Sequence, residues 1–190
     1  MADLATIFRL IDEANAADPG FEDDGSGVHR PAALLYGERM STTLDSFAPY
    51  ASDVLRIACR AQHLERWRLP RSDYPMTKPG YHAWRNEQKR RHGERAGELM
   101  RKAGYGDNEI ARVRALIGKE GIKRDAEVQT LEDVACLVFL KHYAMAFAEA
   151  REAAELKAIM AKTLAKMSAG GRAAAEALDL PRVLRDLAGF

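Results

Sequence analysis

The spacing of apolar residues along the chain indicates a succession of amphipathic helices. Leu4, Ile7, Phe8 and Ile11 recur at helical spacing and predict a first helix over residues 3–16. Further helices are expected at residues 31–47, 52–67, 81–103, 107–117, 130–147, 151–168 and 170–188. No run of strand length shows β-branched residues alternating with polar ones. The pattern therefore predicts an all-α fold.

Two stretches break the helical pattern and predict loops. Residues 18–28 combine an acidic cluster with Gly25 and Gly27. Residues 69–81 read LPRSDYPMTKPGY, and three prolines at this density exclude a regular element. Long loops in compact domains are more often functional than connecting. The proline-rich loop is therefore the first place to look for a site.

The helix expected from Thr130 differs from the others because it is apolar nearly all round. Its apolar positions are Leu131, Val134, Ala135, Leu137, Val138, Phe139, Leu140, Tyr143 and Phe147. A helix without a polar face is buried on all sides, so this one should lie at the centre of the fold. Thr130 is expected to cap it, with Asp133 three positions on, as in a capping box.

Length and composition favour one domain in a reducing compartment. A chain of 190 residues, 47% of them hydrophobic, fits a single compact helical domain. Residues 1–28 would form an N-terminal helix and acidic loop, and residues 151–190 would pack on the core as C-terminal helices. Cys59 and Cys136 lie in apolar stretches without a CxxC pair, which indicates buried thiols.

Several classes of function are disfavoured by the same features. The N-terminus lacks a signal peptide, and the longest apolar run, residues 134–140, is too short to cross a bilayer. We therefore expect a cytoplasmic protein without a membrane partner. The net charge of +1 argues against a general nucleic-acid binder. The oligomeric state stays open.

A basic and aromatic stretch carries most of the candidate chemistry. Between Arg60 and Arg95 there are ten Lys or Arg residues against four acids, with three of the five histidines and both tryptophans. Arginine with flanking aromatics suits phosphate or carboxylate recognition. The alternative for the Lys89–Arg91 run is a solvated helical face. The residues assigned to contacts with a small anionic or phosphorylated ligand are Arg39, Gln62, Arg66, Arg71, Tyr74 and Arg85.

Two histidines and one aspartate are candidate metal ligands. His92 aligns with Tyr81, Trp84, Gln88 and Leu99 on one helical stripe, so it is either a satisfied core residue or a ligand or acid–base group. His63 lies on the same side of its helix as Cys59. Asp133, near the start of the central helix, would either cap that helix or complete a divalent metal site with both histidines. Such a metal would lower the pKa of a bound water for phosphoester hydrolysis.

A set of motifs in order along the chain, from about Ile11 to Met167, resembles an uncharacterised bacterial and fungal family catalogued as "domain of unknown function 4202". The motifs are RPAALLYGERM at 30–40, RAQHLERWRLPRSDYP at 60–75, GYHAWR at 80–85, KRDAEVQTLEDVACLVFL at 123–140 and KTLAKMS at 162–168. The last of these also resembles the KMS element of class I aminoacyl-tRNA synthetases, whose lysine contacts ATP phosphates. Lys162 and Lys166 share one helical face, which suits contact with an anion. The resemblance supplies a family but no activity.

A more distant similarity connects the chain to HD-type phosphohydrolases, helical domains whose metal is held by histidines and aspartates. It implies an HD-like fold in which His63, His92 and Asp133 hold a divalent ion such as Mn, Fe, Co, Mg or Zn. Two positions depart from the pattern: Leu64 stands where an aspartate is expected, and LLYGERM at 34–40 lacks the first histidine. Glu38 or Glu132 would then serve as an extra ligand or general base.

Two functions follow from these resemblances and residues. The first is a metal-dependent, HD-like phosphohydrolase acting on a small phosphorylated or nucleotide substrate. The second is a non-catalytic helical protein that binds an anionic ligand through the arginine-rich loop.

Overall fold

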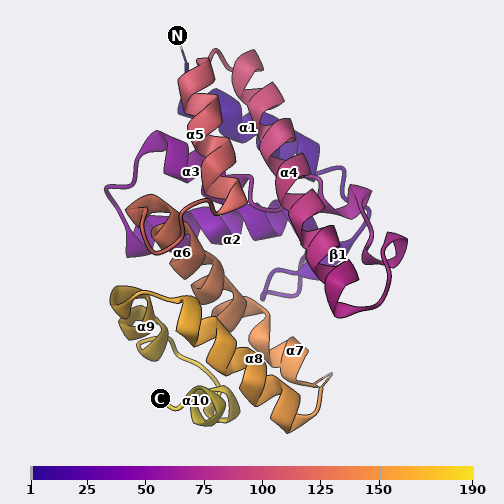
Figure 1. Ribbon diagram of the computed structural model, residues 1–190, viewed down its shortest axis with the longest axis vertical. Helices are drawn as coiled ribbons and strands as arrows, with labels where there is room; N and C mark the ends of the chain where they lie inside the picture. The colour runs from indigo at the N-terminus through magenta and orange to yellow at the C-terminus, as the bar shows by residue number, and fades with distance from the viewer. Residues whose placement is uncertain (1, 150) are drawn as a thin grey trace.

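The computed structural model describes residues 2–149 and 151–190, and nearly all of the regular structure in them is helical (Figure 1). The helices are α1 (Leu4–Asn15), α2 (Ala32–Phe47), α3 (Asp53–Arg60), α4 (Lys78–Lys102), α5 (Asp107–Gly118), α6 (Ala126–His142), α7 (Ala144–Glu149), α8 (Ala153–Lys166), α9 (Ala169–Glu176) and α10 (Arg182–Ala188), with the short 3-10 turns η1 (Arg66–Arg68) and η2 (Arg71–Asp73). The predicted all-α class is confirmed. Within the described residues, no helix combines the length and apolar character of a membrane span.

Helix α6 separates two groups of helices in Figure 1, with α1, α3, α4 and α5 on one side and α7 to α10 on the other. Val128, Leu131 and Val134 belong to the larger core, which α1 to α5 complete. Leu137 and Leu140 belong to a second core built with α8, α9 and α10. The prediction of a central helix that is buried nearly all round is therefore confirmed.

Part of the predicted loop at residues 18–28 forms a small β-hairpin, which the sequence pattern did not predict. Strands β1 (Phe21–Asp23) and β2 (His29–Pro31) pair antiparallel, with Phe21 opposite Pro31. Three-residue strands are too short to show alternation, so their sequences look like loop. The Asp23 carboxylate closes the turn by accepting from the backbone N–H of Gly25 (2.6 Å) and Gly27 (3.2 Å).

Helix α3 ends at Arg60, seven residues before the predicted end at Trp67. The chain then turns, and Glu65 adopts a left-handed conformation with φ 51° before η1 begins. His63 therefore lies in a turn rather than on the predicted helix, so helical spacing from Cys59 does not determine its orientation. The predicted helix at 170–188 is likewise divided into α9 and α10, since Pro181 begins a new helix.

Helix α6 begins at Ala126 rather than at Thr130. Asp125 is its N-cap and accepts from the backbone N–H of Glu127 (3.0 Å) and Val128 (3.3 Å). Thr130 lies inside the helix, where its hydroxyl donates to the Ala126 carbonyl (2.8 Å). The predicted capping box is therefore wrong, and Asp133 lies two turns into a buried helix.

Asp133 instead joins α6 to the N-terminus of α9. One carboxylate oxygen accepts from the Ser168 N–H (2.8 Å) and from Gln129 Nε2 (3.1 Å), and the other accepts from the Ser168 hydroxyl (2.5 Å). The side chain is buried, with Asp133 only 2% exposed. A Cβ on Gly171 would lie 2.6 Å from the Asp133 carboxyl carbon, so this close approach requires glycine.

This contact predicts different effects for two neighbouring glycines. Gly171→Ala is expected to lower the free energy of unfolding by about 1–3 kcal/mol, because the new methyl group overpacks against the carboxylate. Gly170→Ala is the matched control: its Cβ would meet only the Ser168 hydroxyl, at 3.8 Å, so stability should be unchanged or slightly raised. Urea unfolding measures the free energy of unfolding of both variants. Equal effects would contradict the requirement for glycine at position 171.

The same contact is tested from the carboxylate side. Asp133→Ala leaves the Ser168 N–H without its partner and should cost about 1–3 kcal/mol. Because Asp133 and Gly171 touch, the cost of Gly171→Ala should shrink in the Asp133→Ala background. A double-mutant cycle by urea unfolding measures this coupling; strictly additive effects would show that the two residues act independently.

Candidate functional site

Two cavities adjoin where α2, α4, α6 and the turn after α3 meet. One has a volume of about 470 Å³ and the other of about 810 Å³. Tyr36, His63, Arg66, Gln88 and Phe139 line both. We therefore treat the cavities as two lobes of one cleft, the aromatic lobe (470 Å³) and the basic lobe (810 Å³).

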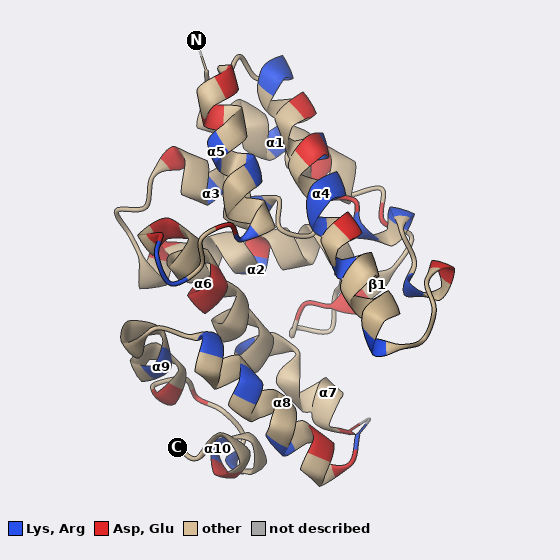
Figure 2. Cartoon of the chain, viewed as in Figure 1, with Lys and Arg blue, Asp and Glu red and all other residues tan. Residues whose placement is uncertain are grey.

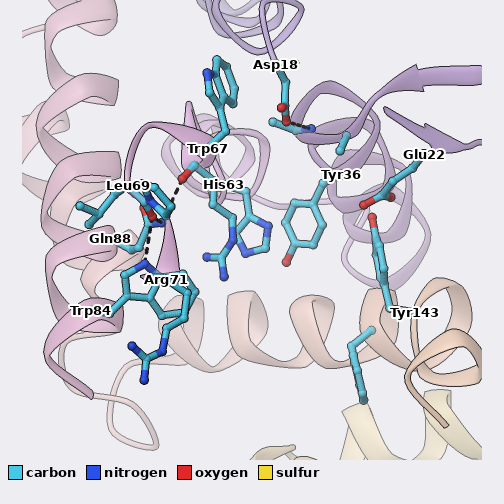
Figure 3. A pocket seen from close by; sticks show the side chains of 15 residues that line it. Asp18, Glu22, Tyr36, His63, Trp67, Leu69, Arg71, Trp84, Gln88 and Tyr143 are labelled. Atoms are coloured by element: carbon cyan, nitrogen blue, oxygen red, sulfur yellow. Dashed lines mark hydrogen bonds between the residues drawn. The ribbon is translucent and has the colours of Figure 1, made fainter. Parts of the chain in front are cut away.

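The aromatic lobe is walled by rings from four separate segments. Its aromatic residues are Tyr36, Trp67, Trp84, Phe139 and Tyr143. Figure 3 shows the Tyr36 ring beside the His63 imidazole, and the two are stacked with centroids 3.7 Å apart and planes 15° apart. The Trp84 indole N–H donates to the Leu69 carbonyl (3.0 Å), which fixes this ring on the proline-rich loop.

Arg66 lies at the junction of the two lobes. Its guanidinium carbon is 4.7 Å from the centroid of the Trp84 ring, within the range of a cation–π contact. No carboxylate of the described chain lies within ion-pair distance of Arg66, and burial lowers the pKa of its guanidinium. A half-buried arginine without a counter-charge is costly, and an anionic ligand would relieve that cost.

The basic lobe concentrates positive charge from distant parts of the chain. Seven Lys or Arg residues line it, and Glu132 is the one acidic residue among its described lining. The cations are Arg66, Lys78, Arg85, Lys89, Lys119, Lys162 and Lys166. Figure 2 shows the corresponding blue segments on α4 and α8.

Glu132 neutralises only part of this charge. It forms an ion pair with Lys119, and its other oxygen is 3.8 Å from Lys166 Nζ. In the described structure the remaining five cations have no carboxylate within ion-pair distance. Burial, with the charges of Lys119 and Arg85, lowers the pKa of Lys89. The lobe thus holds an excess of positive charge that favours an anion.

Two acceptor atoms in the wall of the basic lobe have no partner in the described structure. They are Gln62 Oε1 and His92 Nε2, on side chains only 6% and 3% exposed. The other ring nitrogen of His92, Nδ1, donates to the Leu64 carbonyl (2.7 Å). Burial lowers the pKa of His92 to about 4, so at neutral pH its Nε2 is an unprotonated acceptor.

Most of the predicted site residues meet in this cleft. Gln62, His63, Arg66, Arg85, His92 and Glu132 line the basic lobe, and Arg71 lines the aromatic lobe. Arg71 also donates to the carbonyls of Tyr74 (2.9 Å) and Pro75 (2.7 Å), so it holds the proline-rich loop in shape. Trp84, Gln88, His92 and Leu99 are all buried, which confirms this part of the predicted stripe on α4, whereas Tyr81 at its start is 40% exposed.

Four predicted residues lie outside the described lining of both lobes. Glu38 forms a two-pronged ion pair with Arg30 (2.6 and 2.7 Å). Arg39 donates to the Tyr143 hydroxyl (2.9 Å) and to Glu22 (3.2 Å). The Tyr74 carbonyl accepts from Arg71, and the Asp133 carboxylate accepts from Ser168, the N-cap of α9.

The predicted metal ligands are not gathered at one point. The rings of His63 and His92 are 6.2 Å apart, whereas the Asp133 carboxylate is taken by Ser168 and Gln129. Among the described residues there is no group of three or more His, Cys, Asp or Glu side chains that could hold a metal. These three residues therefore do not fit a shared metal site, and a divalent ion stays a prediction.

Several cations of the lobe were not assigned from the sequence. Lys78 and Lys119 lie 41 positions apart and give no local signal of convergence. The spacing of Lys162 and Lys166 did give a local signal, because it placed both residues on one face of a helix. Both line the basic lobe. Cys59 and Cys136 are buried free thiols, as predicted.

The fold and the cleft define an all-α protein with an anion-attracting pocket, and comparison with known proteins then supplies a family. The chain belongs to the family described as "Domain of unknown function (DUF4202)", whose sequence profile matches residues 5–188. This confirms the resemblance read from the motifs. Searches of curated proteins and of solved structures found no match. The similarity to HD-type phosphohydrolases therefore rests on sequence motifs alone.

The buried histidine predicts how stability depends on pH. In the unfolded chain His92 titrates near its ordinary value of 6.5, whereas in the folded protein it resists protonation down to about pH 4. The unfolded state therefore binds more protons between these values, and stability should fall as pH drops from 6.5 towards 4. His92→Gln removes this titration and should make the decline shallower by about 1–3 kcal/mol.

Urea unfolding between pH 4 and 7 measures this effect. Glutamine can still donate to the Leu64 carbonyl, so the variant should fold. His29→Gln, at an exposed position on the hairpin, is the control and should leave the profile unchanged. A profile for His92→Gln parallel to that of the natural protein would contradict the assignment.

Proposed function

We propose that this protein binds a small phosphorylated molecule in the basic lobe. The observation that carries the proposal is that the described lining of one concave site has seven Lys or Arg residues and one carboxylate. Arginine forks and lysine ammonium groups are the side chains that recognise phosphate. The whole chain has a net charge of only +1, so this local excess is concentrated rather than general.

The arrangement of the cations supports binding from two sides. Lys78, Arg85 and Lys89 come from α4, and Lys162 and Lys166 come from α8. A phosphate group between these helices would receive hydrogen bonds from both. A volume of about 810 Å³ suits a small molecule, whereas a polynucleotide backbone needs an extended basic surface.

Binding is tested by calorimetry with tripolyphosphate, an anion that has no other recognition features. We expect the natural protein to bind it, and Lys162→Ala combined with Lys166→Ala to weaken binding at least about tenfold, because two charge-assisted contacts are lost. Raising the salt concentration should weaken binding further.

Lys157→Ala is the matched control for this experiment. Lys157 is an exposed lysine on the same helix and is not among the described lining residues of either lobe. The Lys157→Ala variant should bind tripolyphosphate as the natural protein does. An equal loss in this control, or no binding by the natural protein, would refute the proposal.

Hydrolysis of the bound phosphate ester is the second candidate, and the observation that favours it is the pair of neutral imidazoles in the basic lobe. Burial, then the charge of Arg66, lowers the pKa of His63 well below its usual value, which keeps the imidazole unprotonated at neutral pH and also weakens it as a base. A neutral imidazole accepts a proton from an attacking water, which is the role of a general base. The predicted HD-like site would add a divalent metal, but of its three named ligands only His63 and His92 line this lobe, while Asp133 lies outside it.

A phosphatase screen separates this candidate from simple binding. With nucleotides and sugar phosphates as substrates, the enzyme reading predicts release of inorganic phosphate and a loss of about 100-fold or more in His63→Gln, since general base catalysis contributes a factor of that order. Binding of tripolyphosphate and the thermal midpoint should be retained in the variant. No release by the natural protein, with or without Mn²⁺, Co²⁺ or Mg²⁺, would leave binding as the function.

A further inference from the structure

The two lobes of the cleft differ in chemistry along its length. The aromatic lobe offers ring faces, and the charges of its described lining balance, with two carboxylates against two guanidinium groups; these residues are Asp18, Glu22, Arg66 and Arg71. The basic lobe offers seven cations and one carboxylate. A single ligand that fills both lobes would join a flat, uncharged group to a polyanionic one, and the charges fix which end enters which lobe.

The aromatic lobe is suited to a planar ring. Tyr36, Trp67, Trp84 and Tyr143 reach it from α2, η1, α4 and the end of α6. Figure 3 shows these rings around one space, with the His63 imidazole between Trp84 and Tyr36 in the view. Stacking on aromatic side chains is worth about 1–3 kcal/mol for a nucleic-acid base. The volume of about 470 Å³ leaves room for such a ring.

The two unpartnered acceptors need hydrogen-bond donors, which phosphate does not supply. Gln62 Oε1 and His92 Nε2 are buried in the basic lobe without donors in the described structure. Phosphate oxygens are themselves acceptors at neutral pH, so an inorganic polyphosphate would leave both atoms unsatisfied. A ligand with hydroxyl or amino donors close to its charged end would satisfy both atoms.

The position of these acceptors places the donors near the junction of the lobes. His92 lies next to His63, a junction residue, with ring centroids 6.2 Å apart. A donor group at this point would stand between the planar part of the ligand and its phosphates. In a nucleotide, that position belongs to the ribose and its hydroxyl groups.

We infer that the ligand is a nucleoside polyphosphate, with its base in the aromatic lobe, its phosphates in the basic lobe and its ribose hydroxyls donating to Gln62 and His92. The inference rests on the proposed function, because it names the ligand of the same cleft. It adds a role for the aromatic lobe and for the two buried acceptors, neither of which phosphate binding alone requires.

Calorimetry with three probes tests each part of the ligand separately. The probes are tripolyphosphate, ATP and 2′,3′-dideoxy-ATP, and GTP and UTP repeat the ATP measurement without presuming the base. We expect at least one nucleoside triphosphate to bind about tenfold or more tighter than tripolyphosphate, since base stacking is worth 1–3 kcal/mol. The dideoxy nucleotide should bind about threefold to tenfold more weakly than ATP, because a hydrogen bond is worth about 0.5–1.5 kcal/mol.

Two variants assign these differences to residues. Trp67→Ala should weaken ATP binding about tenfold and leave tripolyphosphate binding unchanged, because only the base would touch this ring. Tyr50→Ala is the control, since Tyr50 is 99% exposed and is not among the described lining residues. Gln62→Leu should weaken ATP binding but not dideoxy-ATP binding, a pattern that a merely structural role would not produce.

The outcomes separate this inference from the function on which it rests. Equal affinity for tripolyphosphate and every nucleotide would overturn the inference and leave phosphate binding standing, as would tighter binding of a sugar bisphosphate than of any nucleotide. A Gln62→Leu variant that binds ATP as the natural protein does would show that water serves the acceptor, and would overturn the ribose contact. Failure of all probes to bind would refute the proposed function itself.

Discussion

Burial of α6 on both of its faces is the constraint on which the rest of the structure depends. The larger core packs on one face and the C-terminal helices pack on the other, so α6 is shared by two hydrophobic cores. Two acidic residues near its middle, Glu132 and Asp133, are only 5% and 2% exposed and therefore need partners within the protein. Asp133 accepts from Ser168, the N-cap of α9, and Glu132 pairs with Lys119 at the end of α5 and lies 3.8 Å from Lys166 at the end of α8. These contacts tie α6 to the helices on both of its sides.

The cleft is a consequence of that placement. Fixing α8 beside α6 brings Lys162 and Lys166 to face the cations of α4, while Glu132 supplies only one negative charge between them. The turn after α3 then brings His63 and Arg66 to the boundary with the aromatic rings. Positive charge, ring faces and two unpartnered acceptors thus converge from segments that are far apart in the chain. This convergence is what favours a phosphorylated ligand over a solvated surface.

The helical fold and the centre of the site were predictable because local periodicity encodes them. The stripe of Trp84, Gln88 and His92 and the apolar surface of α6 follow from side-chain spacing on one helix. The role of Asp133 was not predictable, since its partner Ser168 is 35 positions away and belongs to another helix. Glu38 was assigned to the site as a substitute for a histidine missing from the HD pattern, and Arg39 as a contact for the anionic ligand. Their partners, Arg30 and Glu22, lie on a hairpin too short to predict.

The most direct measurement is a crystal structure of the protein grown with ATP. Phosphate oxygens within hydrogen-bond distance, about 2.7–3.2 Å, of Arg66 and of Lys162 or Lys166 would agree with the account. Phosphates bound only outside the basic lobe, with these three side chains unchanged and uncontacted, would contradict it.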